Sequence, residues 1–167
     1  MIWLTLLPIS WAAQLLAVLL SPLSALLIRD DGTLPKWLAW SGTTDNPNWG
    51  DEGHEKRWGY AHSFMQVVAW ICRNRAYSFH WDGRLGACIN SPVRVYGDPW
   101  IKNRQGARAG WYFCLASGYW NFKLIYHLFG DTAIMLEFGW KLQEFAQGKT
   151  EGRAQYVFSP RLTAFYP

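Results

Sequence analysis

The sequence predicts an α+β protein with an apolar N-terminal helix, one amphipathic helix and a small antiparallel β-meander. Three observations support this fold class. An uncharged apolar run opens the chain, apolar residues then recur at helical spacing, and after residue 78 short β-prone runs alternate with turn formers. Residues 1–28 would form an apolar membrane-anchor segment, and residues 29–167 one small α+β body.

The opening run, Ile2 to Ile28, contains no Asp, Glu, Lys or Arg. As a helix it would extend about 40 Å, which is enough to cross the hydrocarbon core of a bilayer. Pro8 and Pro22 lie inside the run, and a helix broken at both would suit a hairpin or an interfacial position. A spanning helix is favoured because transmembrane helices tolerate proline. The alternative is a helix packed inside a protein assembly.

All charged side chains follow this run, and the first basic ones are Arg29 and Lys36. The positive-inside rule therefore places the body in the cytoplasm. The three cysteines show no CxxC or Cys/His spacing, which argues against a disulfide framework and a structural zinc site. A reducing compartment is the expectation from both observations.

The body divides into three stretches. Residues 29–56 are rich in Gly, Pro, Asp and Asn and predict a loop-rich linker. Residues 57–74 predict an amphipathic helix, since apolar residues from Tyr60 to Ile71 recur at spacings of three and four. Residues 78–167 predict mostly β structure, with a hairpin turn at Gly130 and Asp131. The β-prone runs are 92–96, 110–115, 120–128, 133–142 and 154–158.

A basic and aromatic group of residues is the first candidate site. Arginines interleaved with aromatic side chains suit a face on anionic lipid headgroups, and less well a single-stranded nucleic acid. The competing interpretation is that the aromatic side chains belong to the core. The candidate membrane-interface or anion-binding residues are Trp37, Trp40, Arg73, Arg75, Arg84, Arg104 and Arg108.

The second candidate is the acidic loop over residues 45–55. Asp45, Asp51 and Glu52 could bind Ca²⁺ or Mg²⁺, although the spacing does not fit an EF-hand. Asp51 or Glu52 could equally cap the helix that follows. The sequence predicts no other cofactor. It contains no HExxH, GxSxG, P-loop or GxGxxG motif, so no catalytic residue is assigned, and a membrane-bound enzyme using this loop is only an alternative.

Four segments carry a family resemblance: DGTLPKWLAW at 31–40, TTDNPNWGDEG at 43–53, VVAWICRNRAYSF at 67–79 and FGWKL at 138–142. Together with the apolar N-terminus, they resemble an uncharacterised family of small Trp-rich tailed-bacteriophage proteins. The resemblance implies a phage origin and a bacterial host, and it supplies no catalytic residues. The expectation is a non-enzymatic accessory protein at the host inner membrane, with a lipid surface and a protein partner or second copy as its contacts. The alternative is a virion component of the tail or ejection apparatus.

Overall fold

A computed structural model describes residues 2–81 and 85–166, and it confirms the α+β class. The chain forms two compact units, Met1–Leu85 and Gly86–Pro167. The apolar N-terminal helix belongs to unit 1 and packs against other helices there, whereas the sequence predicted a boundary after residue 28. Packing of this helix against the segments that follow explains the later boundary.

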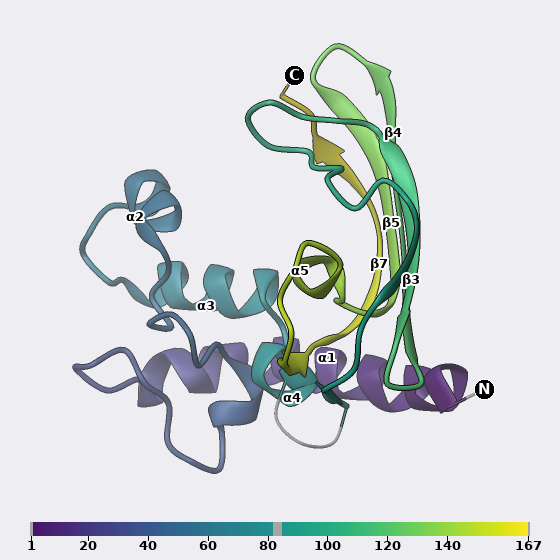
Figure 1. Ribbon diagram of the computed structural model, residues 1–167. Helices are drawn as coiled ribbons and strands as arrows, with labels where there is room; N and C mark the ends of the chain where they lie inside the picture. Colours follow the sequence, from purple (N-terminus) through teal and green to yellow (C-terminus); the bar gives the residue numbers. More distant parts are fainter. Residues whose placement is uncertain (1, 82–84, 167) are drawn as a thin grey trace. The chain divides into compact units, whose positions relative to one another are not determined.

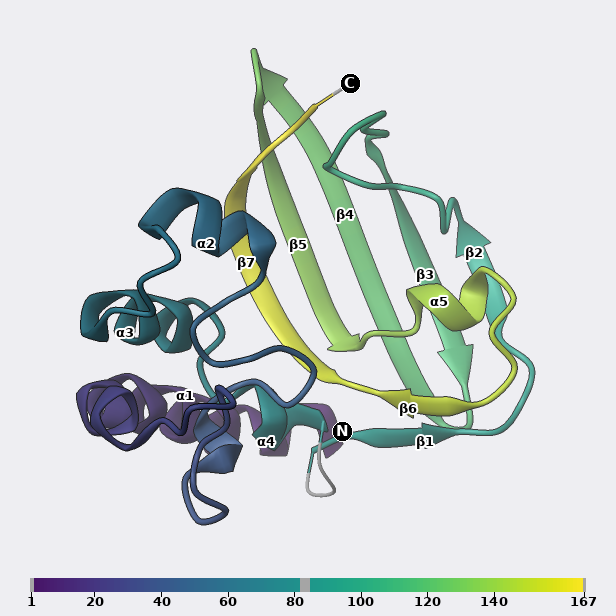
Figure 2. The same cartoon turned by 90° about the vertical axis from the view of Figure 1, so that its left-hand side faces the viewer.

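Unit 1 is built from helices. Its elements are α1 (Ile2–Leu27), the short 3₁₀ helix η1 (Ala39–Ser41), α2 (Glu52–Trp58), α3 (Phe64–Arg73) and α4 (Tyr77–Trp81). Pro8 and Pro22 both lie inside α1 without ending it. Helix α3 lies alongside α1 (Figure 2). Leu34, Leu38, Val67 and Ile71 form a buried cluster against which Leu20 of α1 packs.

Helix α3 forms the larger part of the amphipathic helix predicted over residues 57–74, but residues 57–58 belong to α2 and residues 59–63 separate the two helices. Helix α2 ends at Gly59, which has a φ of +83°, a conformation that favours glycine. Helix α3 begins after Ser63, whose hydroxyl accepts a hydrogen bond from the Gln66 N–H at 3.3 Å. Asp51 caps α2 by accepting from the His54 N–H at 2.9 Å, which confirms one of the two predicted caps.

Unit 2 contains a five-stranded antiparallel sheet in the order β2-β3-β4-β5-β7, as the meander predicted. A hairpin joins β4 to β5 at Gly130 and Asp131, where it was expected. The strands are β2 (Arg94–Gly97), β3 (Gly110–Ala116), β4 (Tyr119–Phe129), β5 (Thr132–Trp140) and β7 (Tyr156–Ala164). A two-stranded pair, β1 (Ala87–Ile89) with β6 (Gly152–Ala154), and the helix α5 (Gln143–Ala146) complete the unit.

Helix α5 lies on the concave side of the five-stranded sheet, which we call its inner face (Figure 1). Tyr112, Cys114, Ile125, Ala133 and Met135 are buried on this face. Burial raises the pKa of the Cys114 thiol to about 12, so the side chain remains neutral and acts as a small apolar group. The inner face is therefore the core of unit 2.

Candidate membrane-binding surface and apolar sheet face

Helix α1 buries small side chains and exposes large ones. The buried positions recur at spacings of three and four, which places them on one side of the helix. They are Ser10, Ala13, Ala17, Ser21 and Ser24, and the one large side chain of α1 that is also buried, among the described residues, is Trp3 near its start. The exposed residues include Leu4, Ile9, Leu15, Leu16, Leu19, Leu23 and Leu26, and none of the exposed residues of α1 is charged. This distribution is the reverse of that in an amphipathic helix of a water-soluble protein.

Small residues allow close approach between helix backbones, and they are typical of helix interfaces in membrane proteins. Among the described residues, α1 is the helix that is long and apolar enough to cross a membrane. The core helix of a soluble protein can be equally long and apolar, but such a helix is mostly buried. Only 22% of the most apolar part of α1 is buried. The apolar residues of α1 are therefore largely on the surface of unit 1.

A line of hydrogen bonds crosses the packed side of α1. Ser10 Oγ lies 3.0 Å from His80 Nε2 of α4, and Gln14 Nε2 donates to Ser10 Oγ at 3.1 Å. Arg75 Nε in turn donates to Gln14 Oε1 at 2.9 Å. Gln14 stands near the middle of α1, so the exposed Arg75 guanidinium is held beside the middle of the helix. Polar and charged groups of unit 1 thus lie along the side opposite the exposed leucines.

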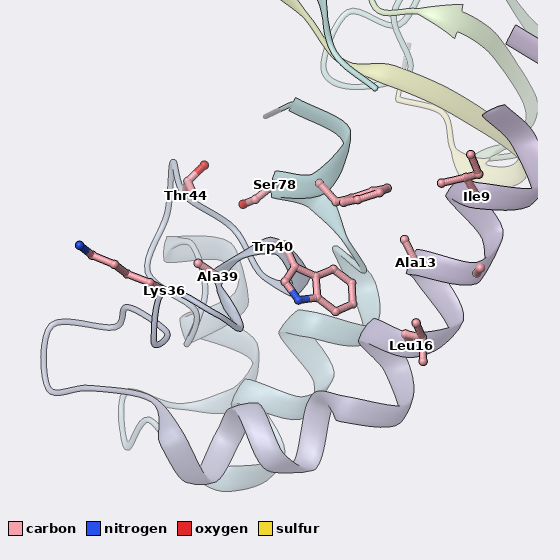
Figure 3. Close-up of a pocket in the computed structure, with 10 residues that line it drawn as sticks. Ile9, Ala13, Leu16, Lys36, Ala39, Trp40, Thr44 and Ser78 are labelled. Carbon is pink, nitrogen blue, oxygen red and sulfur yellow. The ribbon is translucent and has the colours of Figure 1, made fainter. Parts of the chain in front are cut away.

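A groove lies between α1, η1 and α4, with a volume of about 710 Å³ (Figure 3). Its walls are mostly apolar, and Lys36, Thr44 and Ser78 supply the polar side chains. The lining from α1 is Ile9, Ala12, Ala13 and Leu16, and the lining from the other elements includes Ala39, Trp40 and Phe79. Ile9 and Leu16 are also exposed, so the groove is continuous with the apolar surface of α1.

The candidate basic and aromatic residues do not come from a single unit. Trp37 is exposed and Trp40 is half-buried in unit 1, where the Arg73 guanidinium lies 5.5 Å from the centre of the Trp70 ring. Arg75 binds Gln14, as described above. Arg104 and Arg108 are exposed in unit 2, and Arg108 Nε is 2.8 Å from Asp98 Oδ2. Arg84 lies outside the described residues.

The carboxylates of the acidic loop have separate structural contacts. Asp51 caps α2, Glu52 forms an ion pair with Lys56 one turn along the same helix, and Asp45 Oδ2 accepts a hydrogen bond from the Tyr77 hydroxyl at 2.8 Å. No group of three His, Cys, Asp or Glu side chains is placed to hold a metal ion within residues 2–81 and 85–166. Each of the three carboxylates therefore stabilises the local fold, and the three do not converge on one site.

The loop is fixed to unit 1 by the buried side chain of Asn48. Its Nδ2 donates to the Gly32 carbonyl at 3.0 Å and to the Thr43 carbonyl at 3.3 Å, while its Oδ1 accepts from the Thr43 N–H at 2.9 Å. The Trp70 Nε1 of α3 donates to Thr43 Oγ1 at 3.0 Å. One amide side chain therefore satisfies backbone groups from two segments of the loop region.

The face of the sheet opposite α5, which we call the outer sheet face, is apolar along its whole width. Cross-strand pairing aligns one aromatic residue from every strand into a row. The row is Tyr96, Phe113, Phe122, Phe138 and Phe158. Ring centroids are 6.3 Å apart for Tyr96 and Phe113, and 5.4 Å apart for Phe138 and Phe158.

Further apolar residues flank this row on the outer sheet face. Tyr126 and Leu162 are 60% and 70% exposed, and Trp111 and Leu115 are also exposed. The alternation within residues 120–128 is enough to place Trp120, Phe122 and Leu124 on one side of β4. The row across the sheet cannot be predicted in this way, because a single strand does not reveal the register of its neighbours.

A model of a family described as a family of unknown function (DUF7338) matches residues 1–166 of the chain. No curated protein and no solved structure matches the chain.

Proposed function

The chain belongs to this family of unknown function, and from its surfaces we propose that it is a non-enzymatic, membrane-attached protein whose helix α1 lies along the bilayer surface. The observation that supports this function is the exposure of the large apolar side chains of α1. An in-plane helix buries such a face at the boundary between headgroups and acyl chains. The rest of unit 1 then stays on the water side.

The in-plane position follows from what packs on the other side of α1. Arg75 is hydrogen-bonded to Gln14 near the middle of the helix, and His80 meets α1 one turn earlier at Ser10. In a spanning helix, Arg75 would lie near the bilayer centre, where an arginine costs about 3 kcal/mol on insertion scales. In the in-plane arrangement the same guanidinium reaches the headgroups. We therefore favour the interfacial position over the spanning helix that the sequence alone favoured.

The exposed leucines provide enough apolar surface for stable attachment. Leu4, Leu15, Leu19 and Leu26 are 64%, 61%, 65% and 72% exposed. At about 1.5 to 3 kcal/mol for complete burial of one such side chain, these four would contribute about 4 to 8 kcal/mol. A single myristoyl chain gives marginal binding, with an association constant of about 10⁴ M⁻¹ or about 5.5 kcal/mol. The four leucines should match it, and the other exposed apolar residues of α1, such as Trp11 and Leu16, should add to their contribution.

Flotation of the full chain with phospholipid vesicles tests attachment. The variant Leu15→Glu with Leu19→Glu should leave the vesicle fraction, because both charges would enter the apolar layer. The matched control is Tyr126→Glu with Leu162→Glu, which places the same two charges on similarly exposed apolar residues of unit 2. Equal flotation of the α1 double variant and the wild-type chain would refute a role for this face.

Protease protection distinguishes an in-plane helix from a spanning one. A short epitope is added before Met1, and the protein is placed in sealed vesicles with its body on the outside. Protease added outside should remove the epitope if α1 lies in the plane, because both ends of the helix are then on one side. A protected epitope would instead support the spanning arrangement.

The proposed location is the cytoplasmic side of a bacterial inner membrane. Cys72, Cys88 and Cys114 are all free thiols, which suits a reducing compartment. Anionic lipids on the cytoplasmic leaflet would attract the basic residues. The resemblance to tailed-bacteriophage proteins makes this the host membrane during infection, where the protein would act as an accessory factor. Fractionation of infected cells tests the location, and recovery only from soluble cytoplasm would contradict it.

A second candidate function, a component of a protein assembly such as a virion, is supported by the outer sheet face. An apolar face that extends over five strands suits an interface with another protein chain or a second copy. Washed virions should then contain the protein. The variant Tyr126→Glu with Leu162→Glu should reduce its incorporation, whereas Leu15→Glu with Leu19→Glu should not.

A further inference from the structure

The groove beside α1 is formed by a local loss of side-chain volume. Ala12 and Ala13 occupy consecutive positions of α1 between the larger Ile9 and Leu16, and Ala39 of η1 lines the same groove. The rings of Trp40 and Phe79 stand 6.2 Å apart in an edge-to-face arrangement at the same groove. The result is a hollow of about 710 Å³, within the usual size range of small-molecule sites.

The chemistry of the lining favours a hydrocarbon chain as the occupant. Most of the wall is aliphatic or aromatic, and the buried Ser78 hydroxyl already donates to the Gly42 carbonyl at 2.8 Å. The groove is continuous with the exposed face of α1 through Ile9 and Leu16. An acyl chain could therefore pass from the bilayer into the groove without crossing water.

One cationic side chain lines the groove. Lys36 is exposed, and no carboxylate of the described part of the chain lies within ion-pair distance of its ammonium group. Thr44 adds a hydroxyl to the same lining, and in Figure 3 Lys36 and Thr44 lie away from Ile9 and Leu16. A ligand that fits both parts has an apolar chain and an anionic head.

We propose that this groove binds one acyl chain of an anionic phospholipid, with Lys36 contacting the phosphate. The proposal rests on the in-plane position of α1 and adds a defined lipid site to it. A bilayer surface would hold the protein through many exchangeable lipids, whereas the groove would retain one lipid. That lipid should stay bound in detergent, where the bilayer is absent.

Photo-crosslinking of the full chain in dodecyl maltoside tests the site. The probe is an equimolar phosphatidylglycerol with a diazirine near the end of one acyl chain. Peptides that contain Ala39, Trp40 or Phe79 should be labelled, because these residues line the groove outside α1. Unlabelled phosphatidylglycerol should compete for labelling better than phosphatidylcholine or a free fatty acid.

Two variants and their controls complete the test. Ala12→Phe fills the groove from an exposed position and should reduce labelling about ten-fold, whereas Leu19→Phe on the same helix should not. Lys36→Gln should remove about a five-fold preference for the anionic lipid, whereas Lys56→Gln should preserve it. Unchanged labelling in Ala12→Phe would refute the groove, and equal competition by fatty acid would refute the phospholipid. Vesicle flotation of the same proteins reports separately on membrane attachment, since filling the groove leaves the exposed leucines in place.

Discussion

The packing of α1 against the rest of unit 1 predicts a large effect for Ala17→Leu. Ala17 is 0% exposed and packs with Ala13 and Ala76 beside Trp40 and Phe79. A leucine adds three carbon atoms at a position without free space. Such overpacking costs about 1 to 3 kcal/mol of folding free energy. The same change at Ala12, which is exposed on the same helix, adds no carbon to the packed side.

Thermal unfolding in detergent, followed by circular dichroism, measures the difference between the two variants. For a chain of this length, 1 to 3 kcal/mol corresponds to a lower midpoint by about 2 to 12 °C. A second measurement uses Cys72, whose Sγ lies 3.5 Å from Ser21 Oγ of α1. Displacement of α1 should increase the reaction rate of this thiol with a maleimide. Equal midpoints and equal Cys72 rates for Ala17→Leu and Ala12→Leu would refute the packing of α1.

Four further predictions concern single side chains. Gly139→Ala should destabilise the protein by about 3 kcal/mol, because its φ is +99° and a Cβ there would overlap the Trp120 carbonyl oxygen. Gly118→Ala, at a φ of +79° with no atom within 4 Å of the added Cβ, should cost about 1 kcal/mol, and denaturant unfolding compares the two variants. Asn48→Ala should cost about 3 kcal/mol in the same assay, since buried backbone groups lose their partner, and a loss under 1 kcal/mol would contradict this. In the native protein at pH 8, a maleimide should modify the exposed Cys88 and leave Cys114 unmodified, as peptide mass spectrometry would show. Because burial raises the pKa of Cys114 from 9.0 to about 12, the contribution of its thiol to stability should be complete below pH 9 and decline by about 1 kcal/mol per pH unit from pH 9 toward pH 12. The variant Cys114→Ala should reduce this slope of unfolding free energy against pH, and an unchanged slope would contradict the assignment.

The apolar character of α1 could be predicted from the sequence, but the position of its two faces could not. Ser, Ala and Leu are all compatible with an apolar helix, so a hydropathy pattern does not separate the packed side from the exposed side. The signal was the recurrence of Ser10, Ala13, Ala17, Ser21 and Ser24 at helical spacing. A stripe of small residues indicates the packed side of a helix when the large residues on its other side face lipid instead of water.

The division of the predicted helix over 57–74 had a local signal that periodicity conceals. Apolar residues from Tyr60 to Ile71 keep helical spacing on both sides of Ser63, which favours one helix. Ser63 followed by Gln66, however, is the spacing of a capping box and marks a new helix start. The β strands were easier, because Gly130 and Asp131 fix the central hairpin. The inner and outer faces of the sheet remained ambiguous, since both are apolar.

An inward-facing stripe of small residues is a poor choice for a helix that folds in water. Turning the leucines of α1 inward would bury them against α3 and α4 and leave Ser and Ala toward solvent, which the hydrophobic effect favours. The proposed membrane attachment would cover the leucines with another phase. The Arg75 guanidinium, which is exposed and hydrogen-bonded to Gln14, requires water or headgroups on the opposite side. An interface between water and hydrocarbon supplies both environments at once. A full-length protein that is monomeric and soluble without lipid, detergent or a partner would show that the leucines need no such phase.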